Sequence, residues 1–289
     1  MFKDLIKLAR PYQYTKNLFV FLPAFFAFEL SESDVLFNGT LAFIAFSLVA
    51  SSVYILNDWV DKDDDRRHPE KKNRPIASGR VSGVAAFIFF TALVIPGAII
   101  GYSVSLNVFL LLVVYFSLNL AYSLKLKHVP LLDITVIAAG FVLRLFVGSN
   151  ATSVELSHWI IVITFLLALF LALAKRRDDV LIYLETNRKP RKVTDGYNLP
   201  YLNSAMSITS SIVIIAYILW SITPEVTERL NSNNVYITSI FVFLGISRYM
   251  QITFVEEKSS NPSDVLIRDR FLQLILLSWF LMFIYILYL

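Results

Sequence analysis

The sequence predicts an all-helical, polytopic membrane protein with nine transmembrane helices and a cytoplasmic N-terminus. Of its 289 residues, 56% are hydrophobic and only 17% are charged, whereas soluble domains average about 45–50% and about 25%. Nine apolar stretches approach the roughly 20 residues that cross a bilayer core, and the basic residues fall on alternate connections between them. This composition excludes a disordered chain. The absence of cysteine excludes a disulfide scaffold and a thiolate metal site.

The predicted spans are residues 18–30, 38–56, 83–102, 107–124, 129–149, 157–174, 205–223, 234–254 and 271–289. The first is the shortest and contains Pro23. Residues 1–16 place Phe2, Leu5 and Ile6 on one side of a helix and lysines elsewhere. This pattern predicts an interfacial helix on the inner leaflet rather than a secretory signal peptide. The whole chain, 1–289, is expected to form a single transmembrane domain.

The distribution of basic residues predicts the orientation of these spans. Of the 26 Lys and Arg, 24 lie in the N-terminal tail and on alternate connections, and the other two are Arg144 and Arg229. By the positive-inside rule the 24 face the cytoplasm, which places the N-terminus inside and the C-terminus outside. The loops 57–82 and 175–204 are then cytoplasmic and are predicted to form the active site. Because topology explains the net charge of +4, no nucleic-acid partner is expected.

An acidic cluster follows the second predicted span. At 100° per residue, Asp58, Asp61 and Asp65 fall within about 60° of one another on a helix, and Asn57 widens the arc to about 100°. Three carboxylates in one place are unfavourable unless a cation lies among them. Oxygen ligands without His or Cys suit Mg²⁺, so these four residues are the predicted metal ligands. The alternative to a metal site is that the acidic cluster is simply a solvated helix end. His68 is interpreted as a loop residue rather than a metal ligand.

Basic segments near these acidic residues predict phosphate binding. Lys71 and Arg74 lie in a proline-flanked cationic segment that would suit a phosphate. Consecutive cations at the end of the sixth span suit a second anion, although a stop-transfer cluster explains them too. The candidates there are Lys175, Arg176, Arg177, Asp179, Arg188, Arg191 and Tyr197, and further substrate-binding candidates are Lys16, Asn17, Tyr122, Lys125 and Arg144.

Arg144 lies well inside the predicted span 129–149. A charge in that position is expected to face the interior of the helix bundle. It is interpreted either as a ligand of a substrate phosphate, as the partner of an acidic residue, or as part of a purely structural pair.

The pattern NDxxDxxxD at 57–65, followed by HPxKxxRPxASG at 68–79, resembles the UbiA superfamily of intramembrane prenyltransferases. The resemblance implies a nine-span, N-in helical bundle that holds a diphosphate through Mg²⁺ at its cytoplasmic mouth. It also implies a lateral opening for a polyprenyl chain. Asn57, Asp58, Asp61 and Asp65 match the first Asp-rich motif of the superfamily, which implies that the three aspartates are catalytic residues. The chain departs from the usual pattern between spans 6 and 7, where a second DxxxD is missing.

Within the superfamily, the chain is similar to the decaprenyl-phosphate phosphoribosyltransferases, in segments such as RPYQYTKNLFVFLPAFFA and LALAKRRDD. Tyr14 stands where Trp is expected, and Asp179 where Glu is expected. This resemblance implies Mg²⁺-dependent transfer of 5-phosphoribosyl from 5-phosphoribosyl 1-diphosphate to a polyprenyl phosphate in the bacterial plasma membrane, as a step of cell-envelope biosynthesis. The alternatives are prenyl transfer to an aromatic acceptor and a non-enzymatic transporter. The sequence leaves the oligomeric state open, a homo-oligomer included.

Overall fold

The computed structural model describes residues 2–27, 29–67, 71–187, 189, 191–257 and 262–288. His68 and Arg188, interpreted above as a loop residue and as part of a basic cluster, lie outside the described residues. All regular elements in the described part of the chain are helical. The chain divides into two compact units, Met1–Ser157 and His158–Leu289, and each is considered by itself.

The described part of unit 1 contains ten helical segments, three of which are 3₁₀ helices. They are α1 (Phe2–Ala9), η1 (Pro11–Phe21), α2 (Leu22–Phe26), α3 (Ser33–Val60), α4 (Lys62–Arg67), η2 (Lys71–Asn73), α5 (Gly83–Val104), α6 (Leu106–Leu124), η3 (Leu126–His128) and α7 (Leu132–Thr152). Unit 2 contains α8 (His158–Thr186), η4 (Lys192–Gly196), α9 (Leu199–Ser221), α10 (Pro224–Arg229), η5 (Val235–Thr238), α11 (Ser239–Phe254), α12 (Pro262–Arg268) and α13 (Arg270–Tyr288).

Side chains at the helix starts explain several of these boundaries. The Ser82 hydroxyl accepts a hydrogen bond from the Ala85 amide at the start of α5, and Ser105 does the same for α6. Asn198 caps α9 by accepting from the Tyr201 amide at 2.8 Å. Each cap satisfies one amide that has no partner within its own helix.

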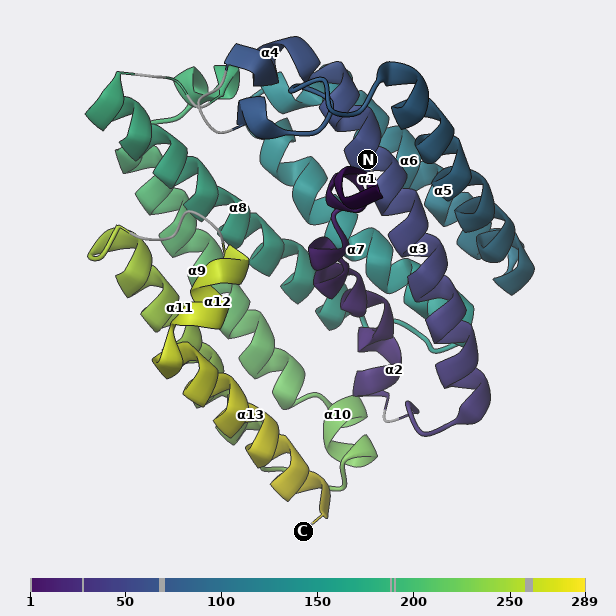
Figure 1. The fold of residues 1–289 in the computed structure, drawn as a ribbon. Helices are drawn as coiled ribbons and strands as arrows, with labels where there is room; N and C mark the ends of the chain where they lie inside the picture. The colour runs from purple at the N-terminus through teal and green to yellow at the C-terminus, as the bar shows by residue number, and fades with distance from the viewer. Residues whose placement is uncertain are drawn as a thin grey trace. The chain divides into compact units, whose positions relative to one another are not determined.

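Helix α3 forms the centre of unit 1 and packs against η1, α5, α6 and α7 (Figure 1). Small residues such as Ala42 and Ala45 on α3 are fully buried and allow these neighbours to approach closely. Phe46 of α3 packs on Tyr115 of α6, with 4.4 Å between the ring centroids. The apolar core therefore surrounds α3 and leaves its C-terminal end, with Asn57 and Asp58, beside α4.

In unit 2, α9 packs against α8 and α11, and α11 packs against α13. Phe170 of α8 contacts Tyr249 of α11, with ring centroids 5.5 Å apart. Near the C-terminal end of α9, the indole of Trp279 donates a hydrogen bond of 2.8 Å to the hydroxyl of Tyr217. These contacts tie α13 to α9 through an aromatic cluster.

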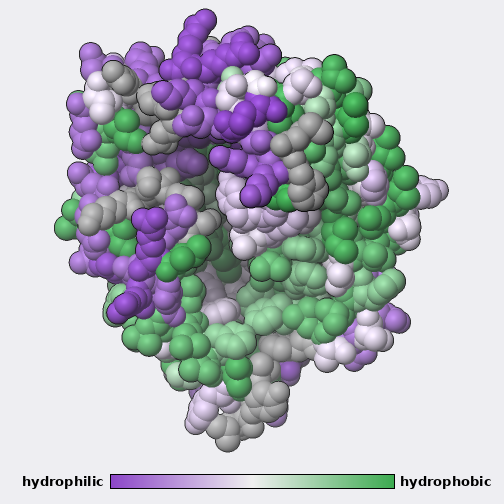
Figure 2. Space-filling model, viewed as in Figure 1, coloured by the Kyte–Doolittle hydropathy of each residue, from purple (hydrophilic) through white to green (hydrophobic). Residues whose placement is uncertain are grey.

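Seven helices in the described part of the chain are long and apolar enough to cross a membrane: α3, α5, α6, α7, α8, α9 and the η5–α11 segment. They correspond to seven of the nine predicted spans, and the protein is an integral membrane protein. The apolar part of α13, Arg270–Ile286, is shorter. The total of nine and the cytoplasmic N-terminus stay predictions. Figure 2 shows hydrophilic residues gathered at the α4 end of unit 1 and a largely hydrophobic flank along α5.

The first predicted span, 18–30, is not a span-length α-helix. Residues 18–26 belong to the 3₁₀ helix η1 and the five-residue helix α2. A 3₁₀ segment of 11 residues is unusually long, because the hydrogen-bond geometry of this helix is poorer than that of an α-helix. Tertiary contacts support it: η1 packs on both α3 and α7, and the backbone of Val20 lies directly against Gly148.

The predicted interfacial helix 1–16 is likewise shorter than expected. Helix α1 ends at Ala9, where Arg10 adopts a left-handed backbone conformation with φ 53° and Pro11 begins η1. One side of α1 is packed within the protein, since Leu8 is fully buried together with Ile55 and Ile76. The helix therefore contacts unit 1 directly, which brings Arg10 close to the end of α3.

The segment 175–204 was predicted to be a loop, but its first part is helical. Helix α8 has 29 residues in all and ends only at Thr186, so it carries the whole basic cluster from Lys175 to Asp179. Arg176 and Asp179 form an ion pair at the i,i+3 spacing, which supports a helix. The helix stops where Asn187 adopts a positive φ of 54°.

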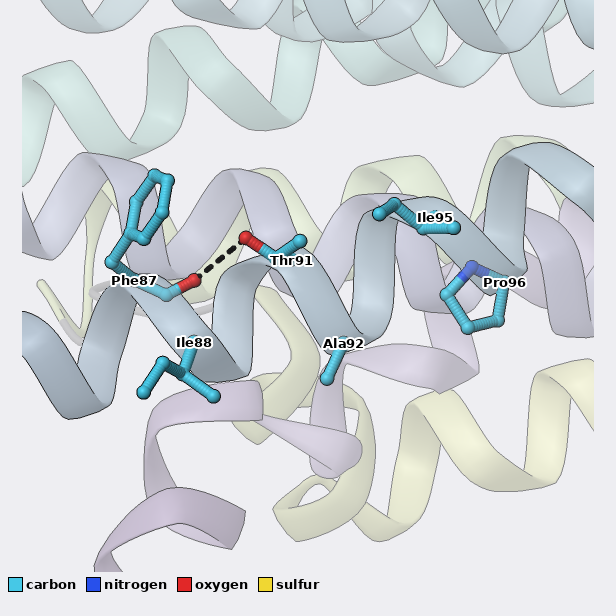
Figure 3. A pocket seen from close by; sticks show the side chains of 6 residues that line it. All are labelled: Phe87, Ile88, Thr91, Ala92, Ile95 and Pro96. Atoms are coloured by element: carbon cyan, nitrogen blue, oxygen red, sulfur yellow. Dashed lines mark hydrogen bonds between the residues drawn. The ribbon is translucent and has the colours of Figure 1, made fainter.

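A shallow pocket lies on α5, and Figure 3 shows its lining. The lining residues are Phe87, Ile88, Thr91, Ala92, Ile95 and Pro96. Its one polar side chain, Thr91, donates a hydrogen bond to the Phe87 carbonyl at 2.9 Å. The lining of this pocket is therefore almost entirely apolar and contains no charged residue.

Candidate functional site

The predicted metal-binding aspartates lie where α3 meets α4. Helix α3 ends at Val60, but the helical hydrogen bonds continue: the Asp61 amide donates to the Asn57 carbonyl and the Asp65 amide to the Asp61 carbonyl, at 2.9 and 2.8 Å. Asp58 and Asp65 are buried and Asp61 is half-buried, whereas Asp63 and Asp64 are exposed. The helical spacing therefore turns the three motif aspartates toward the protein.

Each of these three carboxylates is paired with a cationic side chain. One nitrogen of Arg74, Nη1, lies 2.9 Å from Asp58 Oδ1 and 2.7 Å from Asp65 Oδ2. Arg10 Nη2 also contacts Asp58 Oδ1, at 2.5 Å, and Lys127 pairs with Asp61. Among the residues that the structure describes, no three acidic or histidine side chains converge closely enough to hold one metal ion. In the described residues the three motif carboxylates form ion pairs instead.

The donor chemistry of this site nevertheless fits a hard divalent cation. All candidate ligands are oxygen atoms, as Mg²⁺ prefers. In addition, Asn57 Oδ1 is a buried acceptor that has no hydrogen-bond partner within the described residues. A buried acceptor without a partner is destabilising, and a metal ion would satisfy it.

Arg144 of α7 is buried and bridges three elements of unit 1. Its Nε donates to Asn17 Oδ1 at 3.0 Å, and its Nη1 donates to the Gly140 carbonyl at 2.6 Å. Asn17 in turn donates to the Ser47 hydroxyl at 2.9 Å, and the Arg144 guanidinium lies 4.6 Å from the ring centroid of Phe46. These contacts join η1, α3 and α7. The described partners of Arg144 are therefore those expected of a structural residue.

Lys16 lies on η1 beside the buried Asn17 and is itself half-buried. Burial, with smaller contributions from the positive charges of Arg144 and Arg10, lowers the pKa of Lys16 from 10.5 to about 8. Three cationic side chains therefore interact electrostatically around η1. An environment of this kind favours an anion, because a negative charge would relieve the repulsion among them.

We expect the stability of the protein to depend on pH because the pKa of Lys16 is lowered in the folded state. Between about pH 8 and 10.5 Lys16 is protonated in the unfolded chain and deprotonated in the folded protein. Because the unfolded state binds more protons in this range, the free energy of unfolding rises with pH. The thermal midpoint of the wild type in detergent should rise from pH 7.5 to 9.5 relative to that of Lys16→Met. Lys7→Met, which removes an exposed lysine of α1, should instead follow the wild type; equal pH responses in all three proteins would contradict the expectation.

The remaining candidates of unit 1 differ in how far they are buried. Lys71 is half-buried in η2, Tyr122 is half-buried at the end of α6, and Lys125 is exposed. Two cations that do reach the aspartates, Arg10 and Lys127, were not among the predicted site residues. They lie 48 and 66 residues from their partners, and nothing in the local sequence distinguishes Lys127 from Lys125.

In unit 2, three predicted residues meet at one carboxylate. Asp179 Oδ2 lies 2.5 Å from Arg176 Nη1 and 3.3 Å from Arg191 Nε. Arg176 and Asp179 are buried, and Arg191 is half-buried. Two guanidinium groups that share one carboxylate retain a net positive charge, so this group suits an anionic ligand.

Arg177 has a different position, although it is the next residue along α8. Its Nε donates to Asn203 Oδ1 at 2.9 Å and its Nη1 donates to the Thr253 carbonyl at 2.6 Å. These bonds connect α8 to α9 and α11. Lys175 is half-buried, and the buried Tyr197 stacks on Tyr201 with ring centroids 6.2 Å apart. The two hydrogen bonds of Arg177 thus hold α8, α9 and α11 together.

The chain is similar to several known proteins. The profile of the UbiA prenyltransferase family matches residues 17–285. The chain is 30% identical over 285 residues to a decaprenyl-phosphate phosphoribosyltransferase of Mycolicibacterium smegmatis, which covers 95% of this chain and 89% of that protein. It is 31% identical over 280 residues to one from Mycobacterium tuberculosis, with 95% and 91% coverage.

A solved structure has the same fold. The structure of a UbiA homologue from Archaeoglobus fulgidus bound to GPP and Mg²⁺ matches with a TM-score of 0.70 at 19% identity, covering 99% of this chain and 100% of that chain.

Proposed function

The chain belongs to the UbiA prenyltransferase family, and from this membership we propose that it transfers 5-phosphoribosyl from 5-phosphoribosyl 1-diphosphate to a polyprenyl phosphate with release of diphosphate. The observation that carries the proposal is the similarity along 95% of the chain to relatives named decaprenyl-phosphate phosphoribosyltransferase. The protein is a membrane transferase; the donor, the acceptor and the requirement for Mg²⁺ are the proposed parts.

The acidic group of unit 1 is the proposed donor site. Asn57, Asp58, Asp61 and Asp65 would hold Mg²⁺, which supplies positive charge that stabilises the departing diphosphate. Arg74, close to two of these carboxylates, and the neighbouring Lys71 would bind diphosphate oxygens. Lys16 would add a further cation, which Arg144 positions through its hydrogen bond to the adjacent Asn17.

The proposed reaction does not need a strong general base. The bond from ribose C1 to the diphosphate oxygen breaks, its electron pair leaves with the diphosphate, and an oxygen of the polyprenyl phosphate forms the new bond to C1. A phosphate monoester has its second pKa near 6, so the acceptor is already an anion at neutral pH. The developing oxocarbenium character at C1 resembles that of other glycosyl transfers, and the protein's main task is to bind and orient two anions.

The second anion is assigned to unit 2. Arg176 and Arg191 would bind the phosphate of the polyprenyl acceptor while Asp179, between them, fixes their orientation. Lys175 and Tyr197 are proposed to contribute to the same binding, and Arg177 to hold the helices that carry it. Tyr122 and Lys125 remain proposed phosphate contacts of unit 1. In this proposal the chain, 1–289, forms one transmembrane domain, and its loops 57–82 and 175–204 face the cytoplasm.

An activity assay with purified protein tests the proposal. Diphosphate should be released from 5-phosphoribosyl 1-diphosphate only when polyprenyl phosphate and Mg²⁺ are both present. Release from a polyprenyl diphosphate with an aromatic acid, without activity on the sugar donor, would overturn it in favour of prenyl transfer. Ion transport in liposomes without any diphosphate release would overturn it in favour of a transporter.

A further inference from the structure

We propose that residues 124–132, which connect α6 to α7 through η3, form a membrane-interface anchor that binds an anionic phospholipid of the surrounding bilayer. In this inference the exposed leucines of the segment, here called the η3 anchor, enter the acyl region, and Lys125 binds the lipid phosphate. The proposed phosphate contact of Lys125 is thereby assigned to a bilayer lipid rather than to a substrate. The inference is independent of the donor and the acceptor proposed above.

Apolar side chains are grouped on the surface of the η3 anchor. Leu124, Leu131 and Leu132 are 59%, 51% and 42% exposed, and Pro130 is exposed as well. Single exposed apolar residues are ordinary, but a group of them marks contact with a membrane or with another protein. Leu131 also adopts a positive φ of 69°. This conformation is strained for a bulky residue, and strained residues cluster at functional sites.

The two helices that flank the η3 anchor keep it close to the bilayer surface. Helix α6 ends at Leu124 and α7 begins at Leu132, and both helices are of spanning length. Even fully extended, the seven residues between them would reach only about 14 Å beyond the helix ends, at about 3.5 Å per residue. Two hydrogen bonds of 3.1 Å within residues 125–129 make the segment more compact than that. The tip therefore stays near the polar layer of the bilayer, which is about 5–8 Å thick on each side.

A contact with the end of α3 indicates the same depth independently. Lys127 of η3 pairs with Asp61, which lies two residues beyond Trp59. Trp59 is 40% exposed, and its ring packs on Phe87 of α5 with 6.2 Å between the centroids. Tryptophan is enriched at membrane–water interfaces. The pair of Lys127 and Asp61 therefore places the η3 anchor at the level of the lipid headgroups.

Lys125 provides the charge that complements an anionic headgroup. It is exposed and has no ion-pair partner among the residues that the structure describes, whereas Lys127 is already paired. Residues 124–132 contain no Asp or Glu, and the next acidic residue, Asp133, is fully buried. Basic residues at a membrane surface are attracted to anionic lipids. An apolar group beside an unpaired lysine at this depth thus favours a phospholipid over a cytoplasmic protein.

Site-directed spin labelling tests the depth of the η3 anchor, because the chain has no native cysteine. The full-length protein is reconstituted in vesicles of phosphatidylcholine and phosphatidylglycerol. A nitroxide on Leu131→Cys or Leu132→Cys should be more accessible to oxygen, which dissolves in the acyl region, than to a water-soluble nickel chelate. A nitroxide on Lys72→Cys, at an exposed position of η2, should show the opposite order. Preferential access of the nickel chelate to the anchor labels would overturn the inference and fit a protein-binding surface instead.

Native mass spectrometry tests the headgroup, with phosphatidylglycerol or phosphatidylcholine added to the full-length protein in detergent. Lys125→Gln should weaken the binding of phosphatidylglycerol roughly fivefold, the effect of one basic residue near an anionic surface, and leave that of phosphatidylcholine unchanged. Lys72→Gln should change neither affinity. Wild-type affinity of Lys125→Gln for phosphatidylglycerol would overturn the inference, even if this variant bound polyprenyl phosphate more weakly. Neither experiment contains a sugar donor, so failure of the proposed function is a separate result.

Discussion

Asp61→Asn is expected to lower the rate of diphosphate release by about 10²- to 10³-fold, the usual effect of removing one group that stabilises charge in a transition state. The substitution removes a proposed metal ligand and keeps the shape of the side chain. Asp61 is the most informative of the three aspartates because its side chain is 24% exposed and pairs with Lys127. Its neutralisation should therefore leave the fold intact, as the thermal midpoint in detergent will show.

Asp63→Asn is the matched control for this prediction. Asp63 lies two residues away, its side chain is 82% exposed, and it is 3.3 Å from Arg66. An exposed ion pair of this kind contributes little to stability, so this variant should keep wild-type activity. Equal losses of activity in the two variants would show that general negative charge, rather than the position of Asp61, is what the reaction needs.

Gly148→Ala is expected to destabilise unit 1 by about 3 kcal/mol or more, at the upper end of the effects of overpacking. A Cβ atom at this position of α7 would lie 1.8 Å from the carbonyl oxygen of Val20 and 2.8 Å from its carbonyl carbon. Both atoms are backbone, so η1 as a whole would have to move. Because η1 carries Lys16 and Asn17, the thermal midpoint and the affinity for diphosphate should fall together.

Gly140→Ala provides the comparison within the same helix. There the added Cβ would meet Arg144 Nη1 at 3.6 Å and Tyr115 Cε2 at 3.8 Å, which are ordinary van der Waals distances. We expect a much smaller change in the thermal midpoint. If the two alanine variants were equally stable, the close approach of η1 to α7 would not be the feature that holds this segment in place.

The Asp-rich motif could be found from sequence because its information is local. The spacing of Asp58, Asp61 and Asp65 follows the helical period, and the burial of Asp58 and Asp65 beside exposed Asp63 and Asp64 agrees with that reasoning. The cations that meet these carboxylates could not be found in the same way. Whether Lys127 or Lys125 reaches Asp61 depends on how α6 and α7 pack, and no local pattern encodes that.

The amino-acid sequence by itself determined the helical membrane class, seven apolar segments of spanning length and the chemistry of an oxygen-rich acidic site. Hydropathy and helical periodicity act over a few turns, so neighbouring residues are sufficient to specify them. Only the tertiary structure decided that the 18–30 segment forms η1 and α2, that Arg144 bonds to Asn17, and that Arg10 reaches Asp58. Each of these depends on contacts between segments far apart in the chain, whose energies are set by packing and burial rather than by local sequence.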